Sequence, residues 1–232
     1  MTVRMGLLNK KTDWSQEDFR RYWTEVHGPL AARLPGLRSY IQNHVIDTAQ
    51  RGITYKRGPE HVDGFSDLTF ENVDAMREAF ASEVAPALAE DEARFIGRLR
   101  ILTLDRREVN APDPSRKLLK RMSFLRRRSD VDEATFEREW RVEHARLVKL
   151  MPGVAGYRQN LVVEREATKG TPCGYGELPI DGVVELWFTD PESLNAAFAS
   201  PEGVRTMAHA QTFIDEITTF LVEPRVIVPS QA

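Results

Sequence analysis

Two histidines occupy the same place in a spacing pattern that occurs twice in the chain. The pattern consists of three residues four apart: Phe19, Trp23 and His27, then Phe136, Trp140 and His144. An imidazole has a reference pKa of about 6.5, so it can take or give a proton near neutral pH. We therefore predict His27 and His144 as acid–base residues, with buried histidines bonded to backbone groups as the alternative.

The segment after each histidine is rich in β-forming residues and carries phenol and amide groups. Side chains alternate along a strand, which places Tyr40, Gln42 and His44 on one face and Asn43 on the other. Such groups can orient a ligand carbonyl or stabilise an oxyanion, or they can satisfy one another between packed sheets. The catalytic candidates are His27, Tyr40, Asn43 and His144. The substrate-binding candidates are Trp23, Gln42, His44, His61, Trp140, Tyr157, Gln159 and Asn160.

Two acidic residues fall in the middle of predicted strands, where acids are disfavoured. Asp67 and Glu185 are equivalent positions of the two patterns. We predict that they pair with Arg4 and Arg121, which are equivalent residues of the first strand of each copy, with a role in a functional site as the alternative.

The spacing pattern belongs to a duplication of nearly the whole chain. Pro35-Gly36 recurs 117 residues later as Pro152-Gly153, and Asp63-Gly64 recurs 118 residues later as Asp181-Gly182. A constant offset with one inserted residue indicates two copies of one fold. Turn-forming residues mark a linker between the copies. The predicted domains are residues 1–108 and 116–232, joined by a linker at 109–115.

Each copy reads as strand, helix, two strands, helix and strand. In the first copy the strands lie near residues 3–9, 37–46, 63–70 and 98–104, and the helices near 15–33 and 72–91. Ser15 and Asp132 are the predicted N-caps, and a break is expected before Pro86. This order predicts an α+β fold of two ferredoxin-like β-α-β-β-α-β repeats. Their antiparallel sheets would pack face to face, with the helices outside.

The longest motif is Phe19-x3-Trp23-x3-His27-Gly28-Pro29-Leu30, followed by Pro35-Gly36-Leu37-x2-Tyr40-x-Gln42. It resembles the EthD family of the dimeric α/β-barrel superfamily, and Asp63-Gly64 and Asp91-x3-Phe95 fit the same family. The resemblance covers nearly the whole chain, once per half. It implies an intramolecular dimeric α/β barrel and a small cyclic or aromatic ligand. Relatives usually hold such ligands between sheet and helices.

Three functions remain open from the residues and the resemblance. The first is a cofactor-free isomerase, cyclase, dehydratase or decarboxylase, with His27 moving a proton and Tyr40, Gln42 or Asn43 beside the oxyanion. The second is a cofactor-independent oxygenase, in which Trp23 and Tyr40 shape a radical or anion site. The third is a non-catalytic protein that binds a small ligand of a degradation pathway.

The two copies differ around their histidines, which predicts that one site works and the other is structural. The substitutions from the first copy to the second are Gly28-Pro29 to Ala145-Arg146, His44 to Leu161, His61 to Pro179 and Asp91 to His209. The first copy keeps the closer family signature, so we predict that it holds the working site. Long loops near 47–62 and 167–180 are expected to cover the cavities.

Composition limits the partners of the protein. The 232 residues carry 32 Lys and Arg against 35 Asp and Glu, a net charge of −3 that gives no general attraction to nucleic acid. No apolar run approaches the roughly 18–20 residues that span a bilayer, and no secretory signal is recognisable. We expect a cytoplasmic protein that binds a small organic substrate, but neither nucleic acid nor membrane. A homodimer stays open.

Neither a metal nor a cofactor is expected. Cys173 is the single cysteine, so no internal disulfide or cysteine-cluster metal site can form. The histidines lack metal-ligand spacing. Some barrel relatives bind haem, and the resemblance makes His27 the conceivable ligand if this chain does so.

Overall fold

The computed structural model describes residues 1–230. The first repeat comprises β1 (Thr2–Lys10), α1 (Gln16–Tyr22), η1 (Trp23–His27), α2 (Gly28–Ala31), β2 (Ser39–Asp47), β3 (Gly64–Phe70), α3 (Val73–Phe80), α4 (Val84–Phe95) and β4 (Ile96–Asn110). The second comprises β5 (Leu119–Arg127), α5 (Glu133–Arg138), η2 (Glu139–His144), α6 (Ala145–Leu150), β6 (Gly156–Thr168), β7 (Thr171–Pro172), β8 (Gly182–Phe188), α7 (Pro191–Ala199), α8 (Pro201–Ala210) and β9 (Ile214–Val228). Strand β4 thus enters the segment predicted as the linker.

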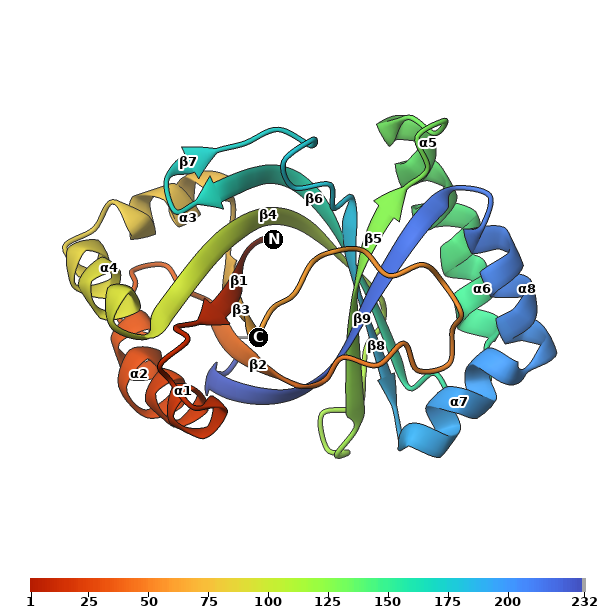
Figure 1. The fold of residues 1–232 in the computed structure, drawn as a ribbon, viewed down its shortest axis with the longest axis horizontal. Coiled ribbons are helices and arrows are strands. Elements are labelled where there is room, and N and C mark those ends of the chain that lie inside the picture. Colours follow the sequence, from red (N-terminus) through yellow and green to blue (C-terminus); the bar gives the residue numbers. More distant parts are fainter. Residues whose placement is uncertain (231–232) are drawn as a thin grey trace.

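Eight of these strands close into one antiparallel barrel (Figure 1). The first repeat supplies the order β4-β1-β3-β2 and the second supplies β9-β5-β8-β6. The pairs β2–β9 and β4–β6 join the two sheets at both edges, which leaves no open side to the barrel. The predicted α+β fold of two ferredoxin-like repeats, with facing sheets and outer helices, is confirmed.

The interior of the barrel is a core that both repeats share. Phe65 of β3 packs edge-on against Phe124 of β5 and Phe220 of β9, with ring centres 5.5 and 5.3 Å away. Valine, leucine and methionine side chains from both sheets fill the space around them. Because each sheet alone would expose this face to water, the two repeats stabilise each other.

Helix ends follow the sequence signals. The Ser15 hydroxyl accepts a hydrogen bond from the Asp18 amide at 3.0 Å, and the Asp132 carboxylate accepts one from the Thr135 amide at 2.7 Å. The second helix of the first repeat breaks at residues 81–83, so Pro86 lies in the first turn of α4. A proline is tolerated there because first-turn amides have no partner within the helix.

In both repeats the first helix widens into a π-helical segment that contains the tryptophan and the histidine. In the first repeat, Pro29 follows this segment and lacks the backbone N–H that a regular helix uses. The second repeat has Arg146 at that position and forms the same wide turn in η2. The π-helix therefore does not depend on Pro29. Such segments are frequent at functional sites.

Each repeat also covers part of the other. The segment 48–63 leaves β2 and crosses β9, where Gln50 Nε2 donates to the Ile217 carbonyl at 2.6 Å and Ile53 enters the helix-side core of the second repeat (Figure 1). In the other direction, Lys169 beside β7 pairs with Glu92 of α4 at 2.7 Å. Among residues 1–230, no helix is long and apolar enough to cross a membrane.

Candidate active site

A histidine–carboxylate pair lies between the helices and the sheet of the first repeat. His27, at the end of η1, places Nδ1 2.8 Å from Oδ2 of Asp91 on α4. The Tyr22 hydroxyl donates to the other carboxylate oxygen at 2.5 Å. Both the His27 and the Asp91 side chains are less than a tenth exposed. An ionised carboxylate only accepts hydrogen bonds, so the neutral ring carries its proton on Nδ1 and its lone pair on Nε2.

The environment of His27 keeps its imidazole neutral at neutral pH. Burial lowers the pKa of His27, and the hydrogen bond from Asp91 opposes this shift without reversing it. Within residues 1–230, Nε2 has no hydrogen-bond partner, and His27 lines a cavity. A neutral, oriented imidazole beside a cavity can act as a general base.

That cavity is a narrow space between the helices and the sheet of the first repeat. The volume open to the centre of a water-sized molecule is about 20 Å³, room for about one water. Its polar lining consists of Arg4, His27, Tyr40, Ser66 and Glu92, and the remaining side chains, Trp23 and Phe80 among them, are apolar. A larger ligand enters only if the helices move away from the sheet, and it would then meet both apolar and polar side chains.

Tyr40 presents a hydroxyl group whose proton is free. Its oxygen accepts hydrogen bonds from Trp23 Nε1 and from Gln42 Nε2, both at 3.0 Å. Burial raises the pKa of Tyr40, so the phenol stays protonated. Since the two accepted bonds use the oxygen lone pairs, the hydroxyl proton can be donated to a ligand. No acceptor for it occurs among residues 1–230.

Gln42 and His44 hold η1 against β2 and do not line the cavity. Gln42 Nε2 donates to the Trp23 carbonyl at 2.7 Å, and Gln42 Oε1 accepts from Thr24 Oγ1 at 3.1 Å. His44 lies 3.2 Å from Gln42 Oε1, and its ring centre is 4.6 Å from that of Trp23. Burial and the nearby arginines Arg20 and Arg225 lower the pKa of His44 to about 4. Both residues position the helix that carries His27.

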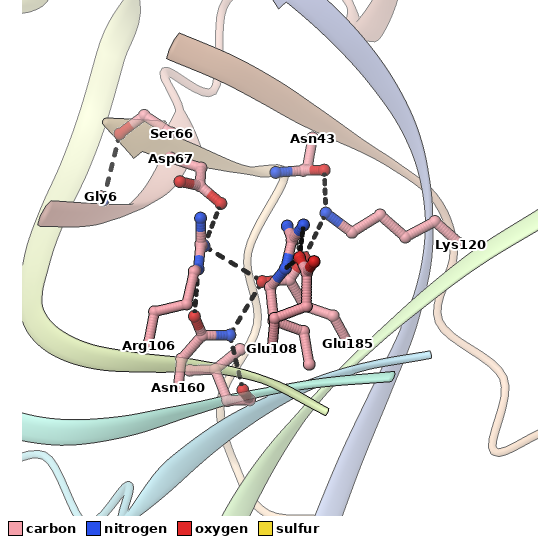
Figure 2. Close-up of polar contacts among 11 residues, drawn as sticks. Gly6, Asn43, Ser66, Asp67, Arg106, Glu108, Lys120, Asn160 and Glu185 are labelled. Atoms are coloured by element: carbon pink, nitrogen blue, oxygen red, sulfur yellow. Dashed lines mark hydrogen bonds and ion pairs between the residues drawn. The ribbon is translucent and has the colours of Figure 1, made fainter. Parts of the chain in front are cut away.

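Asn43 and Asn160 lie on the other face of the sheet, inside the barrel. Asn43 Oδ1 accepts a hydrogen bond from Lys120 at 2.9 Å, and Asn160 Oδ1 accepts one from Arg106 at 2.7 Å (Figure 2). The sheet therefore separates Asn43 from His27, and the structure does not bring the two together. His61 is also away from the cavity, with Nδ1 3.4 Å from Asn9 Nδ2.

A buried ion-pair network occupies the barrel around these asparagines (Figure 2). Arg106 lies 2.5 Å from Asp67 and 3.2 Å from Glu185, and Lys120 lies 2.6 Å from Glu185. Burial favours a raised pKa for Glu185, but Lys120, Arg106 and Arg158 together hold it below its usual range. The network joins charges from both repeats.

The predicted pairing of Asp67 and Glu185 with Arg4 and Arg121 is wrong. In the sheet register Arg4 stands opposite Leu68, and its neighbour Met5 stands opposite Asp67. Residues opposite each other share a face, so Arg4 lies on the helix side and Asp67 in the barrel. The same one-residue offset separates Arg121 from Glu185.

The equivalent space in the second repeat is closed. His144 faces His209 where the first repeat has Asp91, with the two Nδ1 atoms 3.4 Å apart. Burial, together with His209, lowers the pKa of His144 to about 3. Val184 and Ala210 replace Ser66 and Glu92, and Ile53 from the first repeat packs into this core. Tyr157 accepts from Gln159 Nε2 at 2.7 Å, whereas the Trp140 indole nitrogen has no partner among the described residues.

Sequence reasoning missed several residues of this site, among them Asp91, Arg4, Ser66 and Glu92. Asp91 belonged to the family motif but was not linked to His27, because 64 residues separate them. The change of Asp91 to His209 was the available signal, since it alters the partner of a retained histidine. Arg4 was assigned to the wrong face of its strand.

A family model described as EthD domain matches residues 11–98 and 128–217. The chain belongs to the EthD family. The two matched segments cover most of the two repeats and include both histidines and Asp91. No curated protein sequence matches this EthD protein.

Solved structures share its fold across nearly the full length. An anthrone oxidase-like protein is 10% identical, with a TM-score of 0.62, over 100% of this chain and 95% of that chain. A candidate monooxygenase from Lactobacillus acidophilus is 11% identical, with a TM-score of 0.59, over 97% and 94%. A dye-decolorizing peroxidase from Bacteroides thetaiotaomicron is 7% identical, with a TM-score of 0.53, over 95% and 92%. At these identities the similarity concerns the fold.

The cavity does not fit a haem. Nδ1 of His27 is bonded to Asp91, so only Nε2 could ligate iron. That atom belongs to a narrow cavity whose apolar walls include Trp23, Leu34 and Phe80, and a porphyrin would have to force the helices away from the sheet. Among residues 1–230, no three His, Cys, Asp or Glu side chains are grouped to hold a metal ion.

Proposed function

We propose that this EthD protein is an enzyme that moves a proton on a small cyclic or aromatic metabolite, without a cofactor, in the cavity of its first repeat. The observation that carries the proposal is the pair of His27 and Asp91 beside that cavity. It supplies a base whose ring orientation is held and whose charge, once protonated, is stabilised by the carboxylate.

The proposed reaction starts with a C–H bond next to a ligand carbonyl. Nε2 of His27 takes the proton, and the C–H electron pair moves toward the carbonyl oxygen to form an enolate. The Tyr40 hydroxyl donates a hydrogen bond to the developing oxyanion. The imidazolium then returns its proton. Return to another carbon gives isomerisation, and return to a leaving hydroxyl gives dehydration. In cyclisation the enolate carbon attacks a second carbonyl of the same ligand, and the new alkoxide takes the proton from the imidazolium. In decarboxylation a C–CO2 bond breaks in place of the C–H bond, CO2 leaves, and the enolate carbon takes a proton from His27 in its protonated form.

A cofactor-independent oxygenase is the second candidate function. The similarity to an anthrone oxidase-like protein and to a candidate monooxygenase supports it. The first step is the same deprotonation by His27, and the resulting carbanion then gives an electron to O2, the oxidant. Trp23 and Tyr40, which are hydrogen-bonded to each other beside the cavity, would surround that anion.

The test measures proton abstraction before any product is known. The full chain is incubated without oxygen in deuterated buffer with anthrone and with a panel of cyclic ketones, and loss of the C–H signal is followed by NMR. We expect His27→Gln to slow exchange by roughly 10²–10⁴-fold, because glutamine keeps hydrogen bonding but cannot accept the proton. The matched variant His144→Gln should exchange like the wild type.

Admitting air then separates the two reactions. Oxygen uptake that depends on His27 supports the oxygenase, whereas exchange or isomerisation without uptake supports the cofactor-free isomerase class. If the folded His27→Gln protein exchanges protons as fast as wild type, the catalytic proposal fails. If the compounds bind but no proton exchange occurs, the result would support the third function, a non-catalytic protein that binds a small ligand.

A further inference from the structure

We propose that Arg4 makes the cavity of the first repeat a site for organic anions, so that the substrate binds through an anionic oxygen. The inference rests on the proposed function for the location of the site, and it adds the chemical class of the ligand. It begins with the surroundings of one buried guanidinium group.

Arg4 is buried and has no counter-ion. The residue is 6% exposed, and its guanidinium carbon lies 4.0 Å from the centre of the Phe80 ring. Within residues 1–230, its side chain forms neither a hydrogen bond nor an ion pair, although it lines the cavity. A guanidinium stays protonated in proteins, and an unpaired buried charge is costly unless a partner arrives.

Two arginines on the barrel side of the sheet are paired with acids. Arg100 binds Glu60 through two nitrogens, and Arg106 contacts Asp67, Glu185 and Asn160. The fold thus supplies acids to guanidinium groups on the barrel side of the sheet. Arg4 lies on the helix side of the sheet, where its guanidinium group faces the cavity and is not paired with an acid.

The polar groups of the cavity form a complementary set. The Ser66 oxygen accepts from the Gly6 amide at 3.1 Å, which leaves its hydroxyl proton free, as in Tyr40 (Figure 2). Arg4, Tyr40 and Ser66 are therefore donors that lack acceptors among the described residues. Such a set fits an oxygen-rich anion. The apolar side chains beside it would contact the ring once the helices move apart to admit it.

Glu92 does not serve as the counter-ion of Arg4. It lines the cavity, but its carboxylate is 2.7 Å from Lys169, which reaches it from the second repeat. The lysine neutralises this acid at the rim and also lies 5.6 Å from the centre of the Phe80 ring. Glu166 also attracts the Arg4 charge, but neither acid forms an ion pair with the Arg4 guanidinium, which is left free to bind an anion.

The second repeat supplies an internal contrast. Arg121 is equally buried, lies 4.6 Å from the centre of the Phe198 ring, and has two nitrogens without partners. Val184 and Ala210 stand there in place of Ser66 and Glu92, and the space is filled. A buried arginine alone does not make a site; the cavity and the Ser66 hydroxyl distinguish Arg4 from Arg121.

The experiment compares charged and neutral probes of the same shape. Dissociation constants are measured by NMR titration for benzoate, for its neutral isostere benzamide, and for the enolate of 1,3-cyclohexanedione. The proteins are the full chain as wild type, Arg4→Met, Arg4→Lys and Arg121→Met. We expect benzoate or the enolate to bind the wild type at least about tenfold tighter than benzamide. Arg4→Met should abolish this preference, Arg4→Lys should restore part of it, and Arg121→Met should keep it.

Each outcome of these titrations either supports the anion site or overturns it. A preference for benzoate assigns the anion to a carboxylate, and a preference for the enolate assigns it to a ring oxygen. The proposal is overturned if neither benzoate nor the enolate binds more tightly than benzamide, or if Arg4→Met leaves the preference unchanged. Ser66→Val, which copies the second repeat, gives a second variant and should weaken anion binding. His27→Gln should keep the preference while losing proton exchange, so failure of the anion site and failure of the catalytic proposal can be distinguished.

Discussion

The spaces between helices and sheet in the two repeats share a frame and differ in chemistry. In both, a glutamine side chain donates to the carbonyl of the π-helical tryptophan at 2.7 Å: Gln42 to Trp23 and Gln159 to Trp140. Only the first repeat keeps a carboxylate for its histidine and an accessible cavity. The contacts that dock the helix on the sheet therefore occur in both repeats. The histidine, tyrosine and arginine of the proposed site also recur, and the residues that differ around them distinguish the two spaces.

A residue that recurs in both repeats of this chain is not for that reason a functional residue. Trp23, Gln42 and their counterparts recur because every such helix must be attached to its sheet. Asp91, Ser66 and Glu92 do not recur, since the second repeat has His209, Val184 and Ala210. Since His27 and Tyr40 recur as well, repetition alone does not separate structural from functional residues here, and the positions that differ between the repeats supply the distinction.

The largest expected effect comes from making the first repeat resemble the second. Asp91→His should lower proton exchange by roughly 10²–10⁴-fold, because a histidine partner neither orients the neutral ring nor stabilises the imidazolium. Exchange rates of the folded protein measure this. The reciprocal His209→Asp is the control and should leave exchange unchanged. Equal activity of Asp91→His and wild type would remove Asp91 from the mechanism.

Lys120 and Arg121 are adjacent residues of β5 that we expect to contribute differently to the free energy of unfolding. Lys120→Met leaves Glu185 buried with fewer partners and should lower the free energy of unfolding by about 3–5 kcal/mol. Arg121→Met removes a buried cation without a partner and should leave that free energy unchanged or raise it. Urea unfolding at pH 7 measures both. A destabilisation by Arg121→Met as large as that by Lys120→Met would mean that Arg121 has a partner.

The smallest expected effect concerns pH and separates the two histidines. His144 has a pKa near 3 in the folded protein and about 6.5 when unfolded, so below pH 6.5 the unfolded state binds the extra proton. Stability should fall with decreasing pH by up to about 1.4 kcal/mol per unit from this group, down to pH 3. His144→Leu should flatten the dependence. In His27 the Asp91 hydrogen bond opposes the lowering of the pKa, so His27→Leu should flatten it less.

That result would be measured as free energies of unfolding at pH 7, 6, 5 and 4. Parallel curves for wild type and His144→Leu would contradict the assignment of a neutral, buried His144. Steeper dependence on His27 than on His144 would reverse the comparison between the repeats.

Local and repeated features of this protein follow from the sequence alone. The offset of 117–118 residues predicts two copies, Ser15 and Asp132 cap helices through contacts three residues away, and alternation puts Tyr40 and Asn43 on opposite faces of β2. These relations depend on neighbours within a few residues or on direct repetition. The family motif predicts the fold for the same reason, because it consists of residue types at positions that recur along the chain.

The partners of side chains were decided by the tertiary structure. Asp91 meets His27 only because α4 packs beside η1, and Arg4 misses Asp67 because the strand register places them on opposite faces of one sheet. Whether a strand face looks into the barrel or toward the helices depends on how the two repeats close. Ile53 fills the second space because a loop of the first repeat crosses to it. Such contacts join residues far apart in the chain, and no local pattern of residue types encodes them.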